Sequence, residues 1–199
     1  MKKIAFIFIL AAFSFFSCER KSDKKSGNVG EPKTETAKKD IDLIVDSVNT
    51  AWTTLISTEE QKFQDLKRLL DEISYTSSYD PIAHDSLTKK LEIVKAKRYD
   101  QSLDTSAIDA YNNATDRVVF EVLQLKRTTK GIEQHPLADE LENDILAANS
   151  PEKVAQLLGR YNWWTNQYNN YLKKNKKKLE KLGEPYASYK EKAVLFPVN

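Results

Sequence analysis

Apolar and aromatic residues recur at alternating spacings of three and four positions in the C-terminal part of this chain. Between positions 154 and 171 they are Val154, Leu157, Tyr161, Trp164, Tyr168 and Tyr171. This spacing places their side chains on one face of an α-helix, as in the seam of a coiled coil. Ser150 and Pro151 suit the start of such a helix, and Gly183 suits its end. The sequence therefore predicts one helix over residues 151–182 with a largely aromatic core face.

The same periodicity predicts four further helices. They cover residues 40–73, 82–99, 105–130 and 137–148. The chain has only 5 Gly and 6 Pro, which disfavours a loop-rich or all-β fold. Because no helix can bury its apolar stripe alone, we expect an all-α fold, an antiparallel bundle of three to four long helices. The tail is expected to pack back on the bundle through Val194, Leu195, Phe196 and Val198.

The N-terminus has the pattern of an export signal. Lys2 and Lys3 precede an apolar run of 13 residues, Ile4–Phe16, and Ser17 follows it. As a helix this run would measure about 20 Å, too short for the roughly 30 Å hydrocarbon core of a membrane. A basic start, a short apolar stretch and a small residue at its end are typical of a signal peptide, which we assign to residues 1–17.

Cys18 is the sole cysteine of the chain and directly follows this signal. Its position resembles the lipobox of bacterial lipoproteins, in which the acylated cysteine becomes the first mature residue. We therefore expect a lipid, palmitate included, on Cys18, which would hold the chain at a membrane on its extracytoplasmic side. Residues 18–39 are predicted to form the lipidated end and a flexible tether, because they contain almost no apolar residues. Residues 40–199 are then the bundle domain.

Charge is nearly balanced in the predicted domain. Residues 40–199 contain 22 basic and 25 acidic residues, a balance that argues against nucleic-acid binding. One basic cluster follows the aromatic seam, and its members are Lys173, Lys174, Lys176, Lys177 and Lys178. We expect it to be either a solvated helix end or a surface for anionic lipid or envelope glycan. Trp163 lies one position off the seam and is expected to be exposed.

Residues suited to catalysis or metal binding are sparse. His84 and His135 each lack a second His or a Cys at ligand spacing, so we predict no metal site and no cofactor. Carboxylate pairs such as Glu59 with Glu60 are expected on solvated helix faces. The sequence contains no Gly-x-Ser-x-Gly elbow and no Gly-rich phosphate loop. These observations favour a protein without enzymatic activity.

Several short motifs in order resemble the LemA family over roughly residues 48–180. They are Ala51-Trp52, the bend from Gly131 to Asp139, Arg160-Tyr161-Asn162 and Tyr168-Asn169. The resemblance implies a long antiparallel helical bundle at the membrane and no established biochemical activity. It gives Trp52, Arg160, Tyr161, Asn162, Tyr168 and Asn169 a structural role. LemA proteins typically carry an N-terminal membrane helix, whereas this chain has the lipobox-like Cys18.

The function expected from these features is a lipid-anchored scaffold or partner-binding module of the cell envelope, with an envelope protein as its partner. One alternative is an envelope hydrolase with a site around His84, His135 or Glu140, and another is a carrier of a small ligand or a metal. Inter-helical hydrogen bonds that fix the helix register are expected from the asparagines Asn162, Asn169 and Asn170.

Overall fold

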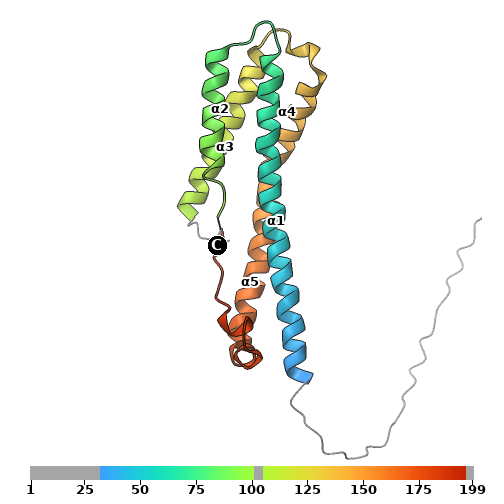
Figure 1. Cartoon of the computed structure of the whole chain (residues 1–199), viewed down its shortest axis with the longest axis vertical. Helices are drawn as coiled ribbons and strands as arrows, with labels where there is room; N and C mark the ends of the chain where they lie inside the picture. Colours follow the sequence, from blue (N-terminus) through green and yellow to red (C-terminus); the bar gives the residue numbers. More distant parts are fainter. Residues whose placement is uncertain (1–31, 101–104, 196–199) are drawn as a thin grey trace, which may run out of the picture.

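The computed structural model describes residues 32–100 and 105–195, and these residues form helices and no strand (Figure 1). The elements are α1 (Pro32–Ser74), α2 (Pro81–Lys95), α3 (Thr105–Thr128), the 3-10 helix η1 (Ile132–Gln134), α4 (Pro136–Ala148), α5 (Pro151–Leu182) and the 3-10 helix η2 (Tyr186–Ser188). The predicted all-α bundle is confirmed, with five α-helices of unequal length. No helix in the described part of the chain is long and apolar enough to cross a membrane.

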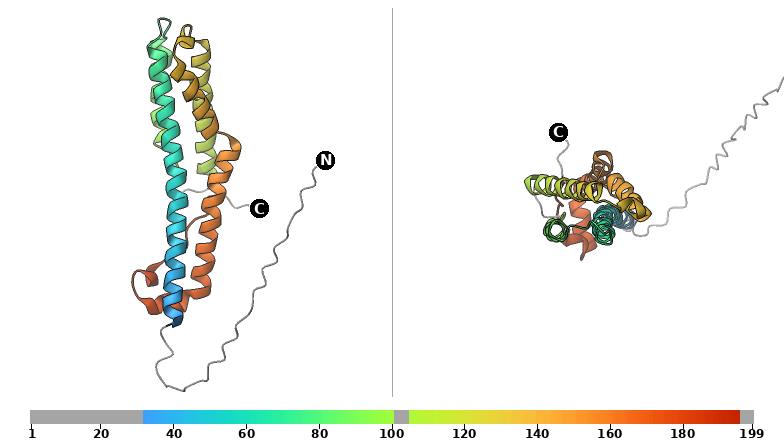
Figure 2. Two further views of the ribbon diagram at one scale, coloured as in Figure 1. Left: turned by 90° about the vertical axis from the view of Figure 1, so that its right-hand side faces the viewer. Right: turned by 90° about the horizontal axis from the view of Figure 1, so that it is seen from above.

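Helix α1 runs the full length of the bundle and contacts each of the other four α-helices (Figure 1). Helices α4 and α5 follow one another along α1 and run antiparallel to it (Figure 2). Asn149 and Ser150 separate the two helices. Helices α2 and α3 form a hairpin beside the upper half of α1 only. In the lower half the chain after η2 rises beside α5, where the third and fourth helices of a complete bundle would lie.

Local signals explain where the helices end. The Ser150 hydroxyl accepts a hydrogen bond from the Lys153 amide at 3.3 Å, and Pro151 opens α5, as predicted. Gly183 ends α5 with a φ of 73°, which an L side chain adopts only at a cost. Asp80 caps α2 through the amides of Ile82 and Ala83.

The start of α1 differs from the sequence pattern. The helix begins at Pro32, eight residues before the position expected from the apolar stripe, so the last part of the predicted tether is helical. Proline suits the first turn of a helix. Ala37 is buried, and its carbonyl accepts a hydrogen bond from the Tyr171 hydroxyl at 3.1 Å. Contact with α5 therefore stabilises two turns that carry no apolar stripe of their own.

The core follows α1 from end to end and changes its partner halfway. In the lower half the Trp52 and Tyr161 rings lie 5.3 Å apart and join α1 to α5. In the upper half α1 packs on α2, α3 and α4 through a continuous buried series, which includes Leu66, Leu69, Leu70 and Ile73. The expected return of the tail is confirmed for Leu195, which is fully buried, while Phe196 and Val198 lie outside the described residues.

Candidate functional site

A groove of about 440 Å³ opens between α3 and the first three turns of α5, at the height where the upper and lower halves of the bundle meet. Its α5 wall is mainly apolar and small, and Lys62 of α1 lines its base. Polar side chains come from α3 and from the break between α4 and α5. The lining residues are Lys62, Asn112, Thr115, Asp116, Asn149, Pro151, Val154, Ala155, Leu158, Gly159 and Asn162.

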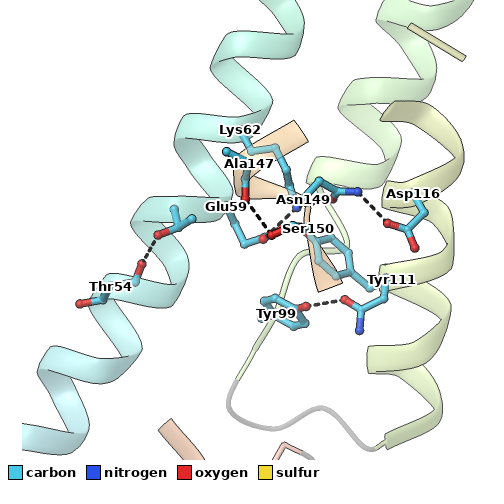
Figure 3. A network of polar contacts seen from close by, with 11 residues as sticks. Thr54, Glu59, Lys62, Tyr99, Tyr111, Asp116, Ala147, Asn149 and Ser150 are labelled. Atoms are coloured by element: carbon cyan, nitrogen blue, oxygen red, sulfur yellow. Dashed lines mark hydrogen bonds and ion pairs between the residues drawn. The ribbon is translucent and has the colours of Figure 1, made fainter. Parts of the chain in front are cut away.

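A buried ion pair lies behind this groove (Figure 3). Lys62 and Glu59 each expose only 2% of their side chains, and Lys62 Nζ lies 2.9 Å from Glu59 Oε1. The ammonium also donates to Asn149 Oδ1 at 3.1 Å, and the Tyr111 hydroxyl donates to Glu59 Oε2 at 2.5 Å. Each charge therefore has an opposite charge and a further hydrogen bond, which is the condition for a charge to remain buried.

The network continues across α3. Asn149 Nδ2 donates to Asp116 Oδ1 at 2.8 Å, so one amide at the α4–α5 break bonds to both α1 and α3. The Tyr99 hydroxyl donates to Asn112 Oδ1, and the Tyr99 and Tyr111 rings stack edge to face with centroids 4.7 Å apart. The helices around the groove are thus held in register by polar groups, in a region where the apolar core is interrupted.

The electrostatics keep the tyrosine protonated. Burial and the nearby Glu59 carboxylate raise the pKa of Tyr111 far above its ordinary value of 10.0. A contact with the Thr115 hydroxyl opposes part of this rise. Tyr111 therefore stays protonated and donates its hydroxyl hydrogen to Glu59.

The buried position of Glu59 overturns the expectation that this carboxylate lies on a solvated face. Glu60 does remain partly exposed, with Lys95 Nζ at 2.7 Å and Arg98 at 2.9 Å from its two oxygens. A signal for the buried pair was present in the sequence. Residues 55, 59, 62 and 66 of α1 are spaced four, three and four apart, so Glu59 and Lys62 occupy the seam between Leu55 and Leu66.

The Tyr-Asn repeat bonds to the tail. Asn169 donates from Nδ2 to the Lys192 carbonyl at 2.8 Å and accepts from the Lys192 amide at 2.9 Å. Asn162 Oδ1 accepts from the Leu195 amide at 2.8 Å. The printed bonds of Asn169 go to the backbone of the returning chain and not to another helix, so the prediction of an inter-helical bond is wrong for this side chain. Asn170 is exposed.

The aromatic residues of the predicted seam pack in or against the core, whereas Trp163 beside the seam does not. Tyr161 and Tyr168 are buried, and Tyr168 packs on Tyr189 of the tail with ring centroids 6.1 Å apart. Burial raises the pKa of Tyr168 to about 12. Trp163 is 54% exposed, as expected, and Arg160 is exposed as well.

The basic cluster Lys173, Lys174, Lys176, Lys177 and Lys178 is exposed along the last turns of α5. Lys173 pairs with Glu191 at 3.2 Å, and Lys178 donates to Asn175 at 3.0 Å. Because α5 runs antiparallel to α1, the cluster lies at the same end of the bundle as Pro32, where α1 begins (Figure 2). Cys18 lies outside the described residues.

The two histidines lie away from the groove. His84 Nδ1 lies 3.5 Å from Asp85, and the ring packs edge to face on Tyr79. His135 Nδ1 lies 3.1 Å from Glu72 of α1. Within residues 32–100 and 105–195 no group of three His, Cys, Asp or Glu side chains is arranged to hold a metal ion. Neither histidine nor Glu140 lines the groove.

The structure is thus an all-α bundle with three notable features. They are a groove with polar residues at its base, a C-terminal tail that is hydrogen-bonded to α5, and a basic end. No family model, no curated protein and no solved structure matches this chain. The groove, the tail and the basic end are therefore the features from which its function has to be inferred.

Proposed function

We propose that this chain is a lipid-anchored protein of the bacterial cell envelope whose helical bundle binds partners without catalysing a reaction. The observation that supports this proposal best is the placement of the lysine cluster at the end of the bundle where α1 begins. A lipid on Cys18 would bring that same end to the membrane. The LemA-like motifs agree with a helical bundle at a membrane.

The length of chain before α1 is compatible with this orientation. Thirteen residues separate Cys18 from Pro32. A flexible segment of that length spans about 20 Å on average. The lysines at the end of α5 would then lie within reach of anionic head groups, where each contributes about 1 kcal/mol of attraction. The lipid would supply the main anchor, and the basic surface would add electrostatic attraction to anionic lipid.

Metabolic labelling with an alkyne fatty acid tests the anchor. We expect the full chain to be labelled and recovered in the membrane fraction. The Cys18→Ser variant should lose the label and shift towards the soluble fraction. An unlabelled chain whose Cys18→Ser variant fractionates unchanged would refute the anchor.

The basic surface needs a separate test, because the lipid would mask it. In the Cys18→Ser background, the lysines Lys174, Lys176 and Lys177 are replaced by Gln, and binding to vesicles with and without anionic lipid is measured. Loss of about 3 kcal/mol corresponds to roughly 100-fold weaker binding to anionic vesicles. A matched control replaces three exposed lysines of the upper half, Lys67, Lys89 and Lys130. Equal effects of the two triple variants would exclude a membrane-facing role of the cluster.

A small-ligand carrier is the second candidate. The groove volume of about 440 Å³ lies within the range of small-molecule sites, and the buried Thr115 side chain lines it. Native mass spectrometry of the full chain tests this candidate. A retained molecule of defined mass would support it, and a ligand-free spectrum after purification in mild detergent would count against it.

A further inference from the structure

The tail is bound to α5 with a regular register. Asn169 holds the backbone of Lys192, and Asn162 holds the backbone of Leu195. The two asparagines are seven residues apart on α5, which is about 10.5 Å along the helix axis. The two tail residues are three apart, and three extended residues also span about 10 Å. The tail therefore runs extended and antiparallel to α5, with three tail residues to every two helical turns.

The surface that the tail follows does not end at Asn162. Asn162 both binds the Leu195 amide and lines the groove between α3 and α5. Beyond it the same face of α5 continues through Leu158 and Ala155, which form the apolar wall of the groove. The part of the tail that the structure describes thus reaches one end of the groove, beside the lower end of α3 (Figure 1).

The residues that follow Leu195 have the chemistry of this groove. They are Phe196, Pro197, Val198 and Asn199. Phe196 precedes a proline, which restricts it to extended backbone conformations. Pro197 has no amide hydrogen and needs no partner for one. The remaining backbone groups would find donors and acceptors on the other wall, at Asn112 and Asn149.

We propose that the groove is a binding site for an extended apolar peptide and that its occupant is the segment Phe196–Val198 of this chain. The segment continues the tail antiparallel to α5. Val198 lies three residues after Leu195 in the sequence, and Ala155 lies seven residues before Asn162. The same register therefore places Val198 beside Ala155. This inference does not depend on the lipid anchor or on the basic end.

A disulfide scan tests the register. Cysteines are introduced at Val198 and Ala155 in the full chain, with Cys18 replaced by Ser so that no other thiol is present. The matched control places the second cysteine at Gln156, which lies at the same height on α5 but does not line the groove. We expect the Ala155 pair to oxidise at least about tenfold faster than the Gln156 pair, because the bound segment raises its effective concentration. Equal rates, or no disulfide from the Ala155 pair, would overturn the proposal.

A third substitution separates binding in the groove from chance collision. Gly159 lines the groove, and a Cβ added there meets no atom within 4 Å, so Gly159→Leu fills the groove without disturbing the helix. In this background the Ala155 pair should oxidise as slowly as the Gln156 pair, with unchanged helical circular dichroism. A rate that Gly159→Leu leaves unaffected would contradict binding in the groove. A small molecule found there by native mass spectrometry, together with slow oxidation of the Ala155 pair, would show a different occupant.

Discussion

Replacing Lys62 by Met should destabilise the bundle more than any surface change. Lys62 and Glu59 are both 2% exposed, with their charged atoms 2.9 Å apart. The substitution leaves the Glu59 carboxylate with the Tyr111 hydroxyl as its remaining described partner. Breaking a buried pair in this way costs about 3–5 kcal/mol, because one charge stays buried without its counter-charge.

A double and a triple variant test the same buried ion pair together with its hydrogen bond to Tyr111. Changing Glu59 to Leu and Lys62 to Met places two apolar side chains in the seam of α1. The residual cost should be about 1–3 kcal/mol, because the Tyr111 hydroxyl then lacks its acceptor. Adding Tyr111→Phe should remove most of that remaining cost. The two single substitutions must therefore be far from additive.

Urea unfolding followed by tryptophan fluorescence and by circular dichroism measures these differences. For a chain of this size, 1 kcal/mol corresponds to about 2–4 °C in Tm, so Lys62→Met should lower Tm by roughly 6–20 °C. Lys67→Met, an exposed change on the same helix, serves as the control and should stay within about 0.5 kcal/mol. A loss below about 1 kcal/mol for Lys62→Met, or additivity with Glu59→Leu, would refute the buried ion pair.

Further predictions concern glycines and acid stability. Gly183→Ala should lower the free energy of unfolding by about 1 kcal/mol because its φ is 73°, whereas helical Gly159→Ala should raise it by up to about 1 kcal/mol. Urea titrations should show that the two substitutions change the free energy of unfolding in opposite directions. Burial raises the pKa of the Glu142 carboxyl, but hydrogen bonds from Lys126 and Arg127 outweigh burial and hold this pKa below 4.5. This stabilisation is full above pH 4.5 and is lost as the pH falls through the lowered pKa, so Glu142→Gln should flatten the acid side of the stability curve.

Much of the helical architecture could be predicted because its signals are local. The end of α1 at Ser74, the cap at Ser150 and the stop at Gly183 each depend on a few neighbouring residues. The spacing of three and four identified the faces that are buried in α1, α3 and α5. The start of α1 at Pro32 could not be predicted in this way, because its first turns are stabilised by contact with α5.

The groove could not be predicted because it depends on which helices are neighbours. Glu59 and Lys62 are ordinary charged residues until Tyr111 from α3 and Asn149 from the α4–α5 break are placed around them. Their position in the seam was a usable signal, since two charges of opposite sign at seam positions three residues apart can neutralise each other. The sequence pattern alone could not say what would surround them.

The partner of Asn169 could not be predicted for a different reason. A spacing of seven on one helix suggests a partner helix with the same repeat, yet an extended chain that advances three residues over the same distance satisfies it as well. The extended partner is possible because the helices have unequal lengths. Helix α1 has 43 residues, whereas α2 and α3 have 15 and 24.

The unequal helix lengths explain why the tail is part of the fold. At 1.5 Å per residue α1 is about 65 Å long and α3 about 36 Å, so the hairpin of α2 and α3 cannot cover the lower half of α1 and α5. Without another segment the apolar faces there would remain in water. The tail after η2 fills this position, with Leu195 fully buried and Tyr189 packed on Tyr168. The groove begins where the described tail gives way to α3, at Asn162, which binds Leu195 and also lines the groove.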